Sequence, residues 1–229
     1  MPFSALPERV AEVRAAIAEA VRRGGHAQAV RLIAVTKTHG PDAVEAAWNA
    51  GIGDVGENKV QEAVVKQAAV RGDAMAVRWH LIGHLQRNKV KQLEHFTLFH
   101  ALDRPTLADA VNDFGLARGR AVDVLVQVNV AGEATKGGYE PAALDAEADR
   151  LKGLLGVRVV GVMTMAPFDA SEEILRRVFR GGRTARDVLV RSGHSAVELS
   201  MGMSADYELA IEEGATLVRL GTVLFGTRL

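Results

Sequence analysis

Arg31-Leu-Ile-Ala-Val-Thr-Lys-Thr-His39, together with the following Asp42-Ala-Val-Glu-Ala-Ala-Trp-Asn49 and Asp54-Val-Gly-Glu57, is the stretch from which the fold can be argued. A short apolar run, an amphipathic segment introduced by Pro41 and a second apolar run together predict a strand, a helix and a strand. After a first helix expected over residues 6–23, this alternation continues to the end of the chain. Strands that are separated by helices pair in parallel.

The whole chain offers eight strand candidates with seven helical stretches between them. The strands are expected at residues 31–36, 54–57, 78–83, 98–102, 123–130, 158–165, 196–200 and 217–225. The helices are expected at 42–49, 59–71, 86–94, 105–117, 141–155, 172–191 and 205–213. Eight parallel strands close into a (β/α)8 TIM barrel, and a doubly wound open sheet is the alternative. Because no linker, repeat or low-complexity stretch interrupts the pattern, we expect residues 1–229 to form a single domain.

Composition excludes several classes of function. Twenty-eight basic residues balance 28 acidic ones, so no overall field attracts nucleic acid or an anionic membrane. The chain has no cysteine, no leader-like start and no apolar run long enough to span a bilayer, which together predict a cytoplasmic protein. His80 and His84 would lie roughly 13 Å apart on a strand, too far to share a metal ion. We therefore expect no metal site.

Lys37 is the first candidate functional residue, because it follows the first apolar run at the strand end where barrels place their chemistry. A lysine ammonium is costly to bury, so a lysine kept inside a barrel would be there as a reagent. Taken alone, Lys37 is explained more simply by a strand that ends at Val35 and a side chain that turns to solvent. A second lysine, Lys136, stands in a glycine-rich loop and is expected to be solvated.

An anion site is indicated near the end of the chain. Ser200-Met201-Gly202-Met203-Ser204 precedes the helix expected at 205–213, and Gly221-Thr222 follows the core of the last strand. Backbone amides at such junctions bind anions, although a turn glycine and a helix N-cap would explain the same residues.

Arg219 is expected to face the lumen, because side chains alternate along residues 217–223. A lumenal guanidinium requires a ligand or a carboxylate, whereas an arginine at a strand edge on the surface would need neither.

A strand-end amine, an anion site and a lumenal cation meet the needs of pyridoxal 5'-phosphate (PLP), which carries an aldehyde, a phosphate and a ring nitrogen. The chain resembles the pyridoxal phosphate homeostasis protein family, small single-domain relatives of the N-terminal barrel of alanine racemase. The resemblance runs nearly from end to end. It rests on Leu32-Ile-Ala-Val-Thr-Lys37, Gly56-Glu-Asn-Lys-Val-Gln-Glu62, Trp79-His-Leu-Ile-Gly-His-Leu-Gln-Arg-Asn-Lys89, Val128-Asn-Val-Ala-Gly-Glu-Ala-Thr-Lys-Gly-Gly138, Gly161-Val-Met-Thr-Met165, Leu199-Ser-Met-Gly-Met-Ser-Ala-Asp206 and Val218-Arg-Leu-Gly-Thr222.

The resemblance implies a role for each candidate residue. Lys37 would form a Schiff base with PLP, Arg219 would face the pyridine nitrogen, and Asn58 would lie near the cofactor ring. The phosphate would be held by Ser200, Met201, Gly202, Gly221 and Thr222.

The resemblance also implies a function, which is to store PLP or deliver it to PLP-dependent apoenzymes. We expect no catalytic turnover, because racemisation needs a second base and the chain offers only Tyr139 and Tyr207 as tyrosines. The alternative is a PLP-dependent racemase or decarboxylase. The second domain that alanine racemase uses for its dimer is absent from the pattern, so a monomer is expected.

Overall fold

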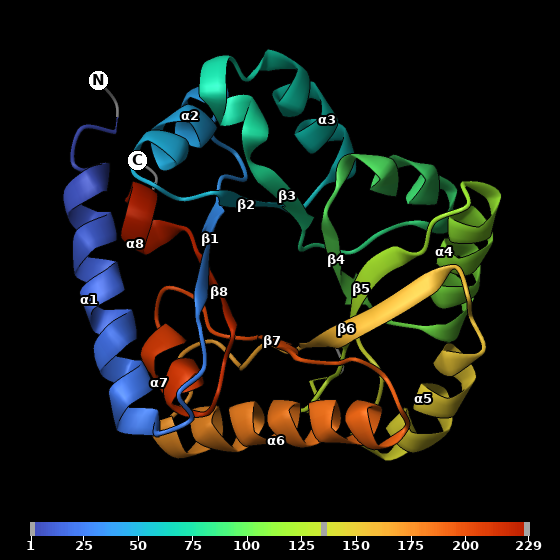
Figure 1. Ribbon diagram of the computed structural model, residues 1–229. Helices are drawn as coiled ribbons and strands as arrows, with labels where there is room; N and C mark the ends of the chain where they lie inside the picture. Colours follow the sequence, from blue (N-terminus) through green and yellow to red (C-terminus); the bar gives the residue numbers. More distant parts are fainter. Residues whose placement is uncertain (1–2, 134–136, 227–229) are drawn as a thin grey trace.

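A closed ring of eight parallel strands forms the centre of the computed structural model, which describes residues 3–133 and 137–226 (Figure 1). Each strand pairs with its neighbours in sequence, and the last pairs with the first. The strands are β1 (Arg31–Val35), β2 (Asp54–Glu57), β3 (Arg78–Leu81), β4 (Leu98–Leu102), β5 (Val122–Gln127), β6 (Val157–Met163), β7 (Glu198–Ser200) and β8 (Leu217–Leu220). The (β/α)8 barrel with an added N-terminal helix is confirmed, and the open sheet is excluded.

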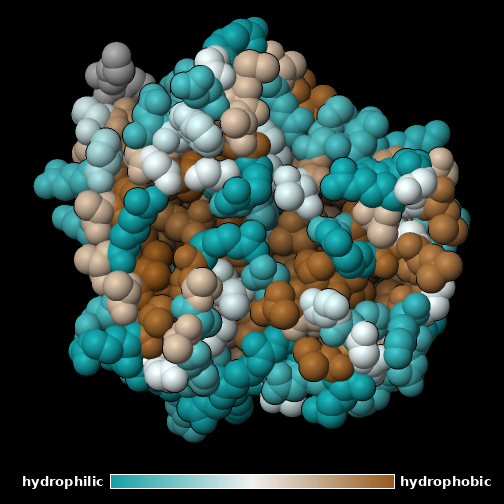
Figure 2. All heavy atoms as spheres, viewed as in Figure 1, coloured by the Kyte–Doolittle hydropathy of each residue, from teal (hydrophilic) through white to brown (hydrophobic). Residues whose placement is uncertain are grey.

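Helices surround the ring (Figure 1). The α-helices are α1 (Leu6–Gly24), α2 (Pro41–Asn49), α3 (Val60–Ala69), α4 (Pro105–Ala117), α5 (Leu144–Lys152), α6 (Glu172–Arg191), α7 (Tyr207–Glu212) and α8 (Thr222–Phe225). Three 3-10 segments complete the layer: η1 (Gly72–Ala76), η2 (Arg87–His95) and η3 (Pro141–Ala143). Figure 2 shows the molecule from the same side as Figure 1; apolar side chains gather in the hollowed centre of the face in view, while polar ones prevail around them. No helix within the described ranges is long and apolar enough to cross a membrane.

Two expected elements were wrong. The eighth strand ends at Leu220 and not at residue 225, because the apolar run Thr222-Val-Leu-Phe225 coils into α8 and buries Leu224. A short apolar run does not by itself distinguish a strand from a helix. Residues 86–94 form the 3-10 segment η2 in place of an α-helix, and its buried residues Val90 and Leu93 have the three-residue spacing that a 3-10 helix brings onto one face.

Side chains alternate between the lumen and the helix layer along every strand. Ile33 of β1 lies opposite Arg219 of β8, and a Cβ on Gly56 of β2 would stand 3.1 Å from Ile33 Cγ2. These three residues therefore face the lumen. Glu57, one residue after Gly56, and Thr36, one residue after Val35, face α3 instead.

A buried ion pair joins α3 to the ends of β1 and β2. Lys66 Nζ lies 2.5 Å from Glu57 Oε1 and donates to the carbonyl of Thr36 at 2.8 Å. The Thr36 hydroxyl donates to the same carboxylate at 2.6 Å. All three side chains are buried. This cluster fixes the backbone one residue before Lys37.

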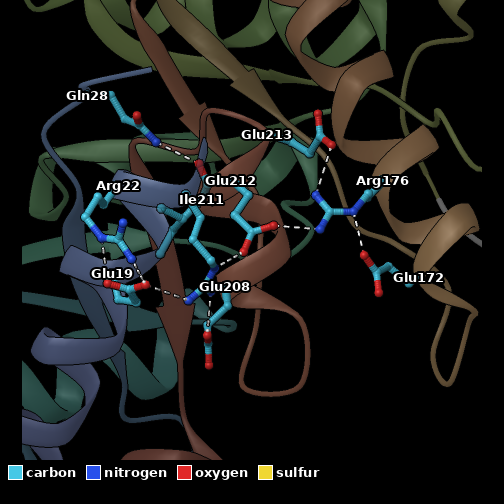
Figure 3. A network of polar contacts seen from close by, with 10 residues as sticks. Glu19, Arg22, Gln28, Glu172, Arg176, Glu208, Ile211, Glu212 and Glu213 are labelled. Carbon is cyan, nitrogen blue, oxygen red and sulfur yellow. Dashed lines mark hydrogen bonds and ion pairs between the residues drawn. The ribbon is translucent and has the colours of Figure 1, made fainter. Parts of the chain in front are cut away.

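The N-terminal helix covers the seam where β8 meets β1 and is tied down by ion pairs (Figure 3). Arg23 of α1 contacts Glu212 at 2.5 Å and Glu208 at 2.9 Å, both on α7. Arg176 of α6 contacts Glu212 from the other side at 2.6 Å. At Gly24 a Cβ would stand 2.6 Å from the Glu212 carbonyl oxygen, so only glycine permits this approach. Three helices are thus joined around one carboxylate.

We predict that Lys66→Ala destabilises the protein by about 3–5 kcal/mol, because it leaves the Glu57 carboxylate buried without its cation. Urea unfolding followed by circular dichroism measures the loss. The control is Lys59→Ala, which breaks an exposed contact with Glu62 and should cost less than about 1 kcal/mol. Equal losses in the two variants would contradict a structural role for the buried pair.

Candidate functional site

The predicted site residues come from four neighbouring strands of the ring. Lys37 follows β1 and Asn58 follows β2, while Ser200 ends β7 and Arg219 lies in β8. Met201 and Gly202 follow β7, and Gly221 and Thr222 follow β8. The structure therefore brings all eight to one side of the barrel mouth, by which we mean the end formed by the C-terminal ends of the strands.

Lys37 stands in a turn at this mouth and is exposed. The strand ends at Val35, as the simpler interpretation of the sequence held, and the His39 amide donates to the Thr36 carbonyl at 3.1 Å to close the turn. Thr38 has φ 69, a left-handed conformation that is strained for a β-branched residue. Lys37 thus lies beyond the end of β1, and its side chain is exposed to solvent.

Arg219 is the buried cation of the site, with 5% of its surface exposed. Its Nη1 donates to Ser200 Oγ at 2.6 Å and its Nη2 to the Thr164 carbonyl at 3.2 Å. Burial lowers the pKa of Arg219 to about 10, against the opposing charge of Asp206. The guanidinium remains protonated at neutral pH.

The hydroxyl of Ser200 is engaged inside the barrel. Besides Arg219, it contacts His100 Nδ1 at 2.9 Å, and the Ser200 side chain is fully buried. A contact between this hydroxyl and a phosphate would compete with both partners. Met201 is 1% exposed and its amide donates to the Leu217 carbonyl at 3.2 Å, so this residue presents little to a ligand. The assignment of both residues to a phosphate remains a prediction.

Backbone amides gather where β8 passes into α8. The amides of Gly221 and Val223 both donate to Ser204 Oγ at 3.3 Å, which is long for a hydrogen bond. Gly202 has φ 92, and a Cβ there would stand 2.7 Å from Ala210 Cβ and 2.9 Å from Tyr207 Cα. Only glycine allows the turn that brings Ser204 over α8. Ser204 was absent from the predicted set, although it stands in the same loop.

Asp206 adds an acidic group beside these amides. Its Oδ1 accepts from the Met203 amide at 2.6 Å, and burial raises the pKa of this carboxyl in spite of that bond and of the nearby Arg219. The carboxyl thus stabilises the loop that carries Ser204.

Asn58 is half-buried beside the loop that follows β3. A Cβ on Gly83 would stand 2.3 Å from the Asn58 carbonyl oxygen, so the two loops touch through their backbones. The next residue, His84, is 62% exposed in its side chain and places Nδ1 2.9 Å from Asp103 Oδ2. Across residues 3–133 and 137–226, no three His, Asp or Glu side chains group to hold a metal ion.

His80 and His100 are core residues. His80 Nε2 lies 2.9 Å from Asp54 Oδ1, and His80 Nδ1 lies 2.9 Å from His100 Nε2. Burial alone would raise the pKa of Asp54, but hydrogen bonds from His80 and Arg78 outweigh it and lower the pKa to about 2. His100 was not among the candidate residues. The sequence marks it only as an imidazole within the apolar strand Leu98–Leu102.

Neither tyrosine offers a ready base. The Tyr139 hydroxyl is buried and donates to Glu147 at 2.8 Å, and burial raises the pKa of Tyr139 above its usual range. Burial also raises the pKa of Tyr207, the first residue of α7. Lys136 lies outside the described residues.

The chain matches the family model of the alanine racemase N-terminal domain over residues 11–229. It is 42% identical to the pyridoxal phosphate homeostasis protein of Aquifex aeolicus (strain VF5), covering 96% of this chain and 97% of that protein. It is 40% identical to the protein of the same name from Pseudomonas aeruginosa, covering 99% of this chain and 97% of that one.

Solved structures agree with these similarities. PipY of Synechococcus elongatus PCC7942, solved without PLP, superposes with a TM-score of 0.87 at 37% identity, over 96% of this chain and 100% of PipY. PipY with PLP bound gives 0.84 at 36% identity over the same shares. An alanine racemase from Clostridium difficile shares the fold at 14% identity and a TM-score of 0.74, over 93% of this chain and 56% of the racemase. By sequence and by fold, the chain belongs to the pyridoxal phosphate homeostasis proteins of the alanine racemase N-terminal domain family.

Proposed function

We propose that this chain binds PLP at the barrel mouth and holds it for delivery within the cell. The observation that carries the proposal is the convergence of an exposed amine, a buried cation and a cluster of backbone amides on four adjacent strands. The relatives named above are pyridoxal phosphate homeostasis proteins, and one solved relative has PLP bound. We propose further that residues 1–229 act as one domain, as a monomer and in the cytoplasm.

The residues present fit PLP. The Lys37 amine would bond to the aldehyde as a Schiff base, and Arg219 would face the ring nitrogen from the lumen. The long bonds from the Gly221 and Val223 amides to Ser204 Oγ mark a place where phosphate oxygens would be better acceptors. Gly202 and Thr222 border that place, and Asn58 would lie at the side of the ring. Bound PLP supplies an electron-withdrawing ring and a reactive carbonyl.

The same residues favour storage over turnover. A guanidinium keeps its proton, so Arg219 would leave the ring nitrogen unprotonated and weaken the ring as an electron sink. Racemisation also needs a base opposite Lys37. The Tyr139 hydroxyl is committed to Glu147, which makes it a poor candidate for that base.

We expect added PLP to give the wild-type protein a visible absorbance band that survives dialysis, and Lys37→Ala to lose it. Borohydride reduction should then attach the cofactor covalently to the peptide that contains Lys37, as read by mass spectrometry. Lys59→Ala, which removes an exposed lysine from the same side of the barrel, is the control and should keep the band. A wild-type protein that stays colourless would refute PLP binding.

Gly202→Ala should lower the affinity for PLP about tenfold and change that for pyridoxal, which lacks the phosphate, much less. The new Cβ would meet Ala210 and Tyr207 and impose roughly 1–2 kcal/mol of strain on a left-handed residue, displacing the loop that carries Ser204. Fluorescence titration gives both affinities. Gly119→Ala is the matched control, since Gly119 has φ 67 with open space around it. A similar loss for both ligands would count against a phosphate site at this loop.

Measuring the transfer of PLP to an apoenzyme distinguishes a delivery protein from an enzyme. We expect the loaded protein to activate a PLP-dependent apoenzyme faster than its own spontaneous release of PLP allows, as followed by stopped-flow activation of the acceptor. We also expect it to turn over amino acids no faster than free PLP does. Rapid racemisation or decarboxylation by the purified protein would favour the enzymatic alternative.

A further inference from the structure

We propose that a chain of hydrogen bonds through the barrel lumen, Arg219–Ser200–His100–His80–Asp54, orients the Arg219 guanidinium toward the cofactor. The last three residues are positioning residues that act through Arg219 and touch no ligand themselves. The inference rests on the proposed function, because it assigns Arg219 to the cofactor ring.

This hydrogen-bonded chain of five side chains is continuous and buried. Its four links measure 2.6 Å from Arg219 Nη1 to Ser200 Oγ and 2.9 Å for each of the contacts Ser200–His100, His100–His80 and His80–Asp54. No member is more than 5% exposed. Because His100 lies on β4 and Ser200 on β7, the chain crosses the lumen. It runs from the first residue of β2, at the floor of the barrel, to the mouth.

The ionised Asp54 carboxylate fixes the first bond of this series. A carboxylate only accepts, so His80 must present its Nε2 proton to Asp54. With no second proton on His80, its Nδ1 accepts from the His100 Nε2 proton. Burial lowers the pKa of His100 well below its ordinary value, so this imidazole carries one proton. Because that proton is on Nε2, Nδ1 keeps its lone pair. The Ser200 hydroxyl donates to that lone pair, and its oxygen is free to accept from Arg219.

The reverse arrangement fits less well. If the proton of His100 stood on Nδ1, His80 would need two protons to reach both His100 and Asp54. Ser200 Oγ would accept from His100 and Arg219 together, and its own proton would lose its acceptor. A buried donor without an acceptor destabilises the folded protein. One direction satisfies every group.

Arg219 depends on this direction because no carboxylate of residues 3–133 or 137–226 forms an ion pair with it. Within the described residues its hydrogen-bond acceptors are the Ser200 hydroxyl and the Thr164 carbonyl. Asp54 is held at the other end by Arg78, with 2.8 Å from Nε to Oδ1 and 2.5 Å from Nη2 to Oδ2. The half-exposed Arg78 thereby keeps Asp54 ionised and the chain aligned.

The test compares Ser200→Ala and Asp54→Asn with Asp123→Asn. Asp123 pairs with Arg158 on β5 and β6 at 2.5 Å through both oxygens, as Asp54 pairs with Arg78, and it has no histidine partner among the described residues. We expect Ser200→Ala and Asp54→Asn each to weaken PLP binding about tenfold and to shift the absorbance maximum of bound PLP. Asp123→Asn should do neither.

Arg219→Gln shows whether the chain acts through the arginine. In that background Ser200→Ala and Asp54→Asn should have no further effect on PLP affinity or on the absorbance maximum. If the losses in PLP affinity added fully in the double variants, the proposal would be overturned. It would also be overturned if Ser200→Ala and Asp54→Asn lowered the melting temperature while PLP affinity and the absorbance maximum stayed at wild-type values. If Asp54→Asn does not fold, the comparison of Ser200→Ala in the wild-type and Arg219→Gln backgrounds decides, together with the imidazole protonation of the wild-type protein.

A second measurement needs no cofactor. Nitrogen NMR of protein with labelled imidazole rings should show His80 and His100 neutral, each protonated on Nε2, and Asp54→Asn should disturb both. A proton on His100 Nδ1 would overturn the chain. If wild-type protein shows the expected protonation but binds no PLP, the proposed function fails while the chain stands, so the two failures can be told apart.

Discussion

Hydrogen bonding between β1 and β8 joins the first and last strands and leaves the sheet without an edge. Through this pairing Ile33 lies opposite Arg219, and a Cβ on Gly221 would stand 3.5 Å from Val35 Cβ. A lysine near the start of the chain and an arginine near its end therefore share one mouth. The N-terminal helix covers this seam and is held there by Arg23, whose ion pairs reach α7. The candidate site is a product of barrel closure.

The buried guanidinium sets the second constraint. A cation in a lumen is costly unless its protons meet acceptors, and Arg219 meets a serine hydroxyl and a backbone carbonyl in place of a carboxylate. The carboxylate whose charge acts on Arg219 is Asp206, while the hydrogen bonds lead on to Asp54 at the opposite end of the barrel, two imidazoles and one hydroxyl away.

The order of strands and helices could be read from the sequence, because apolar runs of strand length alternate with amphipathic ones and proline and glycine mark helix ends. The boundaries were less accurate where a polar residue did not end the apolar run. Thr222–Phe225 continued the pattern of β8 but formed α8, and residues 87–95 took the 3-10 conformation. Lys37, Arg219 and the two glycine turns could be proposed from their places at strand ends. His100 could not, and neither could the contact of Ser204 with the amides of Gly221 and Val223, since these depend on packing across the lumen or between loops.

The sequence by itself determined the fold class, the lumenal face of Arg219 and the family, since periodicity and motif order are local properties of the chain. Tertiary structure alone decided that the Ser200 hydroxyl is engaged by His100 and Arg219, that Ser204 stands over the first amides of α8, and that Lys37 is exposed. Those outcomes depend on the stagger between strands and on which side chains meet across a closed ring. Distances of this kind arise only when β8 returns to β1.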